Sequence, residues 1–230
     1  MSLEKKWFYE EQAKTAVANF KKKNVNAQYV ADRKEALSAV LDMLPEGATI
    51  SRGDSVTLEQ IGIIEKIRKS KKYKFIDPFA RKEDGSYVLS TEDRFKAQRE
   101  AFFADVFLTG TNAVTIDGKL VNVDALGNRV AAMIFGPQKV IVVTGANKIV
   151  KDVDEALKRV REIVAPLNAR RHYQKHRFDW FADLPCVRTG KCADCNHEWR
   201  ICRNTVIIEG TYARVKGRIN LVLVGEELGI

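Results

Sequence analysis

The chain has 230 residues, of which 45% are hydrophobic and 30% are charged, and its formal net charge is +9. A chain of this length buries a normal hydrophobic core, so we expect a globular protein with one domain and an appendage. No apolar run approaches the length of a membrane helix, about 20 residues, and the charged N-terminus lacks the apolar segment of a signal peptide. These features predict a cytoplasmic protein without a membrane span.

The basic residues lie mainly on predicted helices, for example at 21–23 and 69–74. No arginine-glycine tract or recognisable nucleic-acid module accompanies them. This distribution favours a solvated basic surface over a nucleic-acid-binding surface.

Apolar residues recur at helical spacing over residues 4–23, which predicts an amphipathic helix packed across the domain, with Trp7 on its apolar face. After this helix, strand-like and helical patterns alternate, as is typical of a parallel sheet built from βαβ units. The predicted strands are 26–30, 48–51, 73–76, 106–108 and 139–143.

The pair Asp117-Gly118 predicts a hairpin turn that joins strands at 113–116 and 119–123 and interrupts the regular winding. A short helix is expected over 129–135. Residues 151–164 have the pattern of an amphipathic helix, and Pro166 predicts a break after it.

The last part of the chain changes in composition and contains all the cysteines. Two further strand candidates, 205–209 and 218–224, predict a terminal β-hairpin. We therefore expect an α/β domain with its N-terminal helix over residues 1–177, followed by a cysteine-bearing segment and a terminal β-hairpin over residues 178–230.

Three predicted strands end in small polar loops: 52–55, 109–112 and 144–148. If these strands are parallel, the loops converge at one edge of the sheet, where backbone N–H groups and Lys148 would bind an anion. The alternative is that the glycines only satisfy turns and the hydroxyls only cap helices. The predicted ligand-binding residues are Gly53, Ser55, Thr109, Gly110, Asn112, Gly145, Asn147 and Lys148.

Asp54 is the candidate catalytic acid or base, because it lies beside Ser55 in the first of these loops. Asp117 and Asp124 also lie in or near the loops, and the Asp-Gly context of Asp117 indicates a turn residue. The sequence lacks a G-x-S-x-G elbow, a Walker loop and a G-x-G-x-x-G motif. It therefore gives no signal for serine hydrolysis, nucleotide hydrolysis or ordinary dinucleotide binding.

The four cysteines are Cys186, Cys192, Cys195 and Cys202, in the spacing C-x5-C-x2-C-x6-C. Four thiolates in a cytoplasmic protein are a natural ligand set for zinc or an iron-sulfur cluster, with His197 as a substitute ligand. The spacing matches neither a zinc ribbon nor a bacterial ferredoxin, so the sequence leaves the metal open. Redox-active or free thiols and simple packing are the alternatives.

The aromatic residues just before the cysteines have a simpler interpretation. His172 and His176 are four residues apart, but their basic neighbours favour a solvated helix over a metal site. We expect Phe178, Trp180 and Phe181 to anchor the C-terminal segment on the core rather than to stack on a base.

A long segment starting at Thr109, TGTNAVTIDGKLVNVDALGNRVAAMIFGPQKVIVVTGANKIV, resembles the LUD domain of lactate-utilisation proteins, and residues 53–58 are similar to a second segment of that family. The resemblance covers most of residues 5–165. It implies a Rossmann-like three-layer α/β/α sandwich of the sugar-phosphate isomerase and CoA-transferase type. It also implies a bacterial role in L-lactate oxidation with iron-sulfur oxidoreductase partner proteins.

These observations lead to one principal hypothesis and two alternatives. The first is a LUD-domain protein of lactate or related organic-acid metabolism, with an anionic small molecule at the loops and an iron-sulfur cluster or zinc at the cysteines. The alternatives are a standalone sugar-phosphate or CoA-type isomerase or transferase, and a metal-stabilised nucleic-acid-binding module. Whether the chain is itself an enzyme or a subunit of an oxidoreductase system is left open by the sequence.

Overall fold

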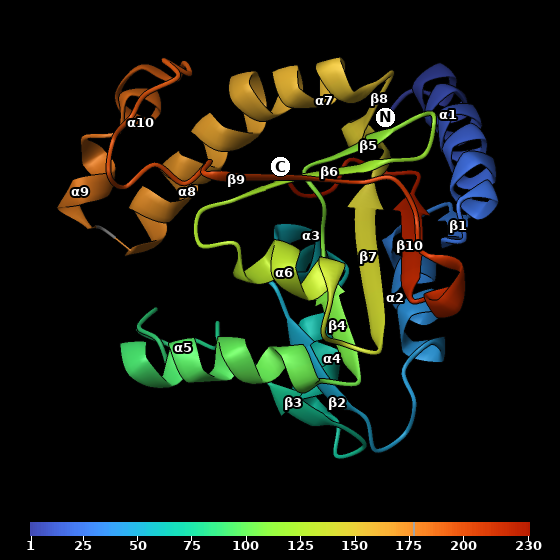
Figure 1. Cartoon of the computed structure of the whole chain (residues 1–230), viewed down its shortest axis with the longest axis horizontal. Coiled ribbons are helices and arrows are strands. Elements are labelled where there is room, and N and C mark those ends of the chain that lie inside the picture. The colour runs from blue at the N-terminus through green and yellow to red at the C-terminus, as the bar shows by residue number, and fades with distance from the viewer. Residues whose placement is uncertain (177) are drawn as a thin grey trace.

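The fold is built on a six-stranded parallel sheet, seen in a computed structural model that describes residues 1–176 and 178–230 (Figure 1). All the predicted strands of the first 145 residues are present. In spatial order the strands are β1 (Asn26–Val30), β10 (Ile219–Val224), β7 (Lys139–Gly145), β4 (Val106–Thr109), β2 (Thr49–Arg52) and β3 (Lys74–Ile76).

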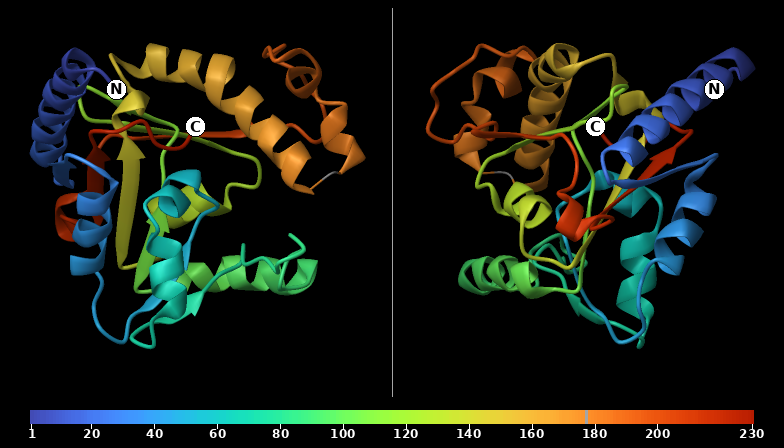
Figure 2. Two further views of the ribbon diagram at one scale, coloured as in Figure 1. Left: turned by 180° about the vertical axis from the view of Figure 1, so that it is seen from behind. Right: turned by 45° about the vertical axis from the view of Figure 1, so that its right-hand side comes forward.

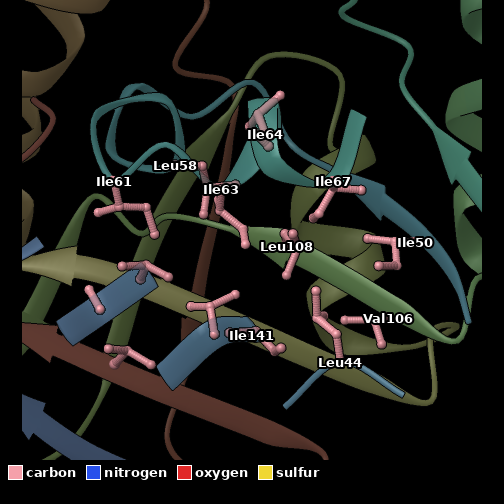
Figure 3. Packing of buried hydrophobic residues seen from close by; sticks show 14 of the residues in the cluster. Leu44, Ile50, Leu58, Ile61, Ile63, Ile64, Ile67, Val106, Leu108 and Ile141 are labelled. Carbon is pink, nitrogen blue, oxygen red and sulfur yellow. The ribbon is translucent and has the colours of Figure 1, made fainter. Parts of the chain in front are cut away.

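Helices cover both faces of this sheet and give the expected three-layer α/β architecture. One face packs against α2, α3 and α4, with Ile50, Leu108 and Ile141 among the buried side chains of that core (Figure 3). The other face packs against α1 and α6. The bounds are α1 (Leu3–Lys22), α2 (Arg33–Asp42), α3 (Val56–Gln60), α4 (Ile63–Lys69), α5 (Thr91–Glu100) and α6 (Asn128–Ile134).

The N-terminal helix begins where Ser2 accepts a hydrogen bond from the Lys5 backbone N–H, a normal N-cap. Its apolar stripe is buried at Ala13, Ala16, Val17 and Phe20. The prediction for Trp7 is wrong, because 65% of its surface is exposed. Trp7 lies nearer the start of the helix than the buried residues, which all fall in the second half.

A second sheet of four strands contains the predicted hairpin. Its strands are, in spatial order, β8 (Ile149–Val150), β5 (Ala113–Thr115), β6 (Leu120–Asp124) and β9 (Asn204–Ile208). β5 and β6 pair antiparallel, and Gly118 adopts the positive φ of +85° that their turn requires. One side of this sheet joins the core under α1, and α7 (Val153–Arg159) covers Ala113 and Val121 on the other.

The predicted terminal β-hairpin is wrong. β9 pairs with β6 in the second sheet, whereas β10 lies between β1 and β7 in the main sheet. All six residues of β10 are buried, because a strand inside a parallel sheet is covered on both faces. The final strand therefore belongs to the α/β domain and not to an appendage; the boundary expected at 177/178 falls at Arg177, which is outside the described residues.

The predicted break at Pro166 is also wrong. The helix continues from α7 through a π-helical turn at Val160–Val164 into α8 (Ala165–His176). Proline lacks an N–H and its ring crowds the preceding turn, and a wider π-turn directly before it relieves both problems. The continuous helix carries the chain away from the second sheet to the short helices α9 (Asp179–Ala182) and α10 (Pro185–Thr189) (Figures 1 and 2).

Candidate functional site

Three strand-end loops meet at one edge of the main sheet, since β2, β4 and β7 are parallel neighbours. The loops approach so closely that a Cβ atom on Gly110 would lie 2.8 Å from the Ser55 hydroxyl. Lys148 connects all three: its Nζ donates to the Thr111 carbonyl at 3.2 Å and lies 3.4 Å from the Thr57 hydroxyl. Glycine at 110 is thus required by the close packing of two loops.

A cavity of about 420 Å³ opens at this edge. Five of the predicted ligand-binding residues line it: Gly53, Ser55, Gly110, Asn112 and Lys148. The other three do not. The Thr109 hydroxyl donates to the Gly110 carbonyl, and Asn147 accepts a hydrogen bond from the Leu228 N–H at 3.1 Å. A Cβ on Gly145 would collide with the same C-terminal stretch, so Gly145 and Asn147 hold that stretch in place.

Lys148 is the most unusual charged group of the cavity, because only 4% of its surface is exposed. Burial, with smaller contributions from the neighbouring charges of Arg159 and Arg129, lowers the pKa of Lys148 to about 7. In the described part of the chain, no carboxylate forms an ion pair with this amine. The cavity therefore contains a buried amine that an entering anion would pair with.

Asp54 lies in the cavity wall but is fully engaged by cations. The Asp54 carboxylate accepts hydrogen bonds from Arg171 Nη2 at 2.9 Å and from Lys175 Nζ at 3.1 Å. Burial alone would raise the pKa of Asp54, but the charges of Arg171 and Lys175 outweigh it and hold the pKa well below its usual range. Such a carboxylate is a weak base at neutral pH, and its evident role is to tie the first loop to α8.

Sequence patterns did not identify Arg129 as a site residue. In the structure, Arg129 holds the second loop by hydrogen bonds. From α6 it donates to Asp124, to the Asn122 and Asn112 side chains and to the Gly110 carbonyl. Asn112 Oδ1 also accepts the Val123 N–H at 2.7 Å. Asn112 is therefore held by the protein itself, and only the tertiary structure identifies Arg129 as its partner.

Another part of the cavity lining is aromatic. A series of rings stacks face to face at centroid distances between 4.4 and 5.8 Å. His172 and His176 belong to this series, and burial lowers the pKa of each to about 4, so both rings are neutral. The members are Tyr87, His172, His176, Phe178, Trp180, Phe181 and Trp199, and we refer to them as the aromatic wall.

The four cysteines surround a second, much smaller cavity of about 20 Å³. Burial raises the pKa of the Cys186 thiol, and the neighbouring Cys195 and Cys202 raise it further. Arg200 Nε donates to Cys202 Sγ at 3.1 Å, and the Asp194 N–H donates to Cys192 Sγ at 3.4 Å. The four thiols are thus gathered in space, with hydrogen-bond donors on two of the sulfurs.

All four cysteines line this small cavity, and their binding of one metal centre stays a prediction. In residues 1–176 and 178–230, no group of three or more cysteine, histidine, aspartate or glutamate side chains is arranged to hold one metal ion. Ile201 lines both the cysteine cavity and the large cavity, and Trp199 lines the large one. The cysteine segment is therefore directly adjacent to the candidate ligand site.

None of the helices that the structure describes is long and apolar enough to cross a membrane. The chain matches no curated protein. Three solved structures match the chain at low sequence identity. A DUF162 family protein from Deinococcus radiodurans is 14% identical with a TM-score of 0.49, and the match covers 95% of this chain and 97% of that one.

The other two similarities are weaker and partial. eIF2B delta from Chaetomium thermophilum is 16% identical, covers 55% of this chain and 50% of its own, and has a TM-score of 0.34. Ribose 5-phosphate isomerase from Plasmodium falciparum is 15% identical, covers 52% of each chain, and has a TM-score of 0.32.

The family assignment comes from the sequence itself. The sequence profile of the LUD domain matches residues 13–224, a longer stretch than the 5–165 expected from the motifs. It extends through the cysteine segment to the end of β10, in agreement with the place of β10 in the main sheet. The chain belongs to the LUD domain family.

Proposed function

We propose that this LUD-domain protein acts in lactate or related organic-acid metabolism as a subunit of an iron-sulfur oxidoreductase system. It binds an anionic small molecule beside Lys148, and its four cysteines hold an iron-sulfur cluster. The observation that carries the first part is a buried amine, without an acidic partner in the described chain, at the point where three strand-end loops meet.

The chemistry of Lys148 suits an anion better than a neutral ligand. With its pKa near 7, the amine is partly neutral at physiological pH because burial disfavours its charge. A carboxylate or phosphate entering the cavity supplies the missing negative partner, so the amine takes up a proton and a charge-assisted hydrogen bond forms. The Ser55 and Thr57 side chains line the same part of the cavity as further polar groups.

The proposed redox role favours a cluster over zinc, because zinc has no redox chemistry. Four thiolates are a ligand set for either a tetrahedral zinc ion or an iron-sulfur cluster, and only the cluster carries electrons. All four cysteines line one small cavity, and Arg200 donates a hydrogen bond to the Cys202 sulfur. A cluster would supply one-electron transfer next to the anion cavity.

The anion site is tested with L-lactate and inorganic phosphate as probes, by calorimetric titration and by the increase in melting temperature. Lys148→Met is compared with Lys151→Met, a matched control whose side chain is exposed in the next turn of the chain. We expect Lys148→Met to weaken binding by about 5-fold or more and Lys151→Met to leave it unchanged. Equal affinities of both variants would contradict an anion site at Lys148.

The cysteine site is tested on protein purified without oxygen. Iron, acid-labile sulfide and zinc are quantified, and the absorption spectrum is followed on addition of dithionite. Iron and sulfide in near-equal amounts with bleaching on reduction are expected. Zinc without iron, or thiols without any metal, would reject the cluster.

A further inference from the structure

The large cavity has two chemically different sides. Its floor is formed by the strand-end loops and carries Lys148, while another part of its lining is the aromatic wall, which comes from the segment before α5, from α8 and α9, and from the cysteine segment. A small hydroxy acid such as lactate would engage only the floor. The cavity volume of about 420 Å³ lies within the range of sites for drug-sized ligands, roughly 300–1,000 Å³.

Most rings of the aromatic wall have their faces occupied by one another. His176 stacks on Tyr87, His172 and Phe178, and Trp180 lies between Phe178 and Trp199. These inner rings serve as packing, in line with the expectation that they anchor the C-terminal segment. A ligand ring can therefore stack only on a ring at an end of the series.

Trp199 is the most exposed end of the series; Phe181, a further end, stacks on His172 and is half-buried. Within the described chain the Trp199 indole stacks only on Trp180, at 5.1 Å, and 45% of the residue surface is exposed. Tyr87, at another end, is covered instead by the guanidinium groups of Arg81 and Arg94, at 4.1 and 3.3 Å from the ring centroid. An indole with a free face beside a cavity is a stacking platform for a planar ring.

We propose that the ligand of this cavity is an anion that also carries a planar aromatic ring, of the nucleotide type, with its acidic group at Lys148 and its ring on the aromatic wall at Trp199. The inference rests on the proposed anion site and specifies the class of its ligand. It also explains why the cysteine segment lies here: the loop that holds the cysteines presents Trp199 and Ile201 to the cavity.

The test compares three probes that share parts of one molecule: AMP, ribose 5-phosphate and adenosine. Affinities are measured by calorimetry on the full chain prepared without oxygen. We expect AMP to bind at least about 5-fold more tightly than ribose 5-phosphate, the gain of one stacked base, and adenosine to bind more weakly than AMP.

Variants separate the ring contact from a general loss of structure. Trp199→Leu should reduce AMP affinity to that of ribose 5-phosphate, whereas Trp199→Phe should retain most of it. Trp7→Leu, at an exposed tryptophan of α1, is the matched control and should change neither. Melting temperatures identify any variant that fails to fold, and in that case Trp199→Phe alone decides, through the AMP to ribose 5-phosphate ratio.

The outcomes distinguish the two proposals. If ribose 5-phosphate binds as tightly as AMP, the ring makes no contact and the aromatic-anion inference is overturned while the anion site stands. If adenosine binds as well as AMP, the wall takes a ring but Lys148 takes no anion, and the proposed function fails. If none of the three binds, both are rejected.

Discussion

The two sides of the large cavity are built in different ways. The floor is made of loops fixed between buried parallel strands, and each loop is held by hydrogen bonds from Lys148, Arg129 or Arg171. The cysteine segment, residues 186–202, has one short helix and mostly exposed or half-buried residues. The floor is preorganised by the fold, whereas the cysteine segment is held mainly by side-chain contacts such as those of Arg200 and the stacking of Trp199 on Trp180.

This difference assigns different roles to the two sides of the cavity. A rigid loop edge binds an acidic group at a fixed position, because its donors are placed before the ligand arrives. A segment with little secondary structure gains most from a cluster that joins its four thiols, since metal binding is also folding free energy. We therefore expect changes on the floor to affect affinity and stability, and changes at the cysteines to affect metal content and local order.

The largest effect is expected from Cys195→Ser. A hydroxyl is a poor substitute for a thiolate, so we expect loss of most of the bound iron and rapid proteolysis within residues 186–202, with the main domain still folded. Iron analysis and limited proteolysis under anaerobic conditions measure this. Lys191→Ala, an exposed neighbour in the same segment, is the control. Unchanged iron content in Cys195→Ser would show that Cys195 is not a cluster ligand.

On the floor, Asp54→Asn leaves Arg171 and Lys175 without their carboxylate. We expect the free energy of unfolding to fall by about 1–3 kcal/mol at pH 7, the cost of leaving partly buried polar groups without a partner. Because the folded-state pKa of Asp54 is depressed, its stabilisation is present above the unfolded pKa, about 3.9, and is lost as the pH falls below it. Denaturant titrations from pH 7 down to the lowest pH at which both proteins fold should therefore show a difference that is constant above about pH 4 and shrinks progressively below it; a difference that does not shrink would exclude the ion pair as the cause.

The pH dependence of ligand binding also tests the floor of the cavity. Since the pKa of Lys148 is about 7, this amine loses its positive charge above that pH in the ligand-free protein. Phosphate or AMP affinity should fall between pH 7 and 9, by at most about tenfold per unit, and binding should take up a proton. Calorimetry in two buffers of different ionisation enthalpy detects this uptake. A flat profile, like that expected for Lys148→Met, would show that Lys148 does not face the anion.

The lowered pKa of Lys148 also affects the free energy of unfolding, which should rise with pH where ligand affinity falls. The unfolded chain carries a normal lysine, with a pKa of about 10.4, so between pH 7 and 10 it binds more protons than the folded state at this position. The contribution of Lys148 to the free energy of unfolding therefore rises with pH over this window. Lys148→Met should remove that rise, which separates a titrating amine from an indirect effect on binding.

The smallest expected effect is that of cluster removal on ligand binding, which involves both the cysteine segment and the cavity. Removing the cluster with a chelator and oxidant should loosen the loop that presents Trp199, so AMP affinity should fall by about 2- to 5-fold. Ribose 5-phosphate, which lacks a ring, should bind as before. A parallel loss for both probes would mean that the cysteine segment supports the floor as well as the aromatic wall.

The sequence by itself determined the family, most of the strands and the loops of the floor. Val140 to Val143 and Val106 to Leu108 are continuous apolar runs that end at glycine and threonine, and this local signal marks a buried parallel strand and its loop. The hairpin at Asp117-Gly118 could also be predicted from the sequence, because a two-residue turn is encoded by adjacent residues.

Only the tertiary structure decided the remainder, since it depends on contacts between distant residues. β10 enters the main sheet between β1 and β7, although its pattern suited a hairpin with β9 just as well. The two cations that hold Asp54 lie 117 and 121 residues further along the chain. Strand pairing and buried ion pairs form where chain segments meet in space, and no local pattern records which segments those are.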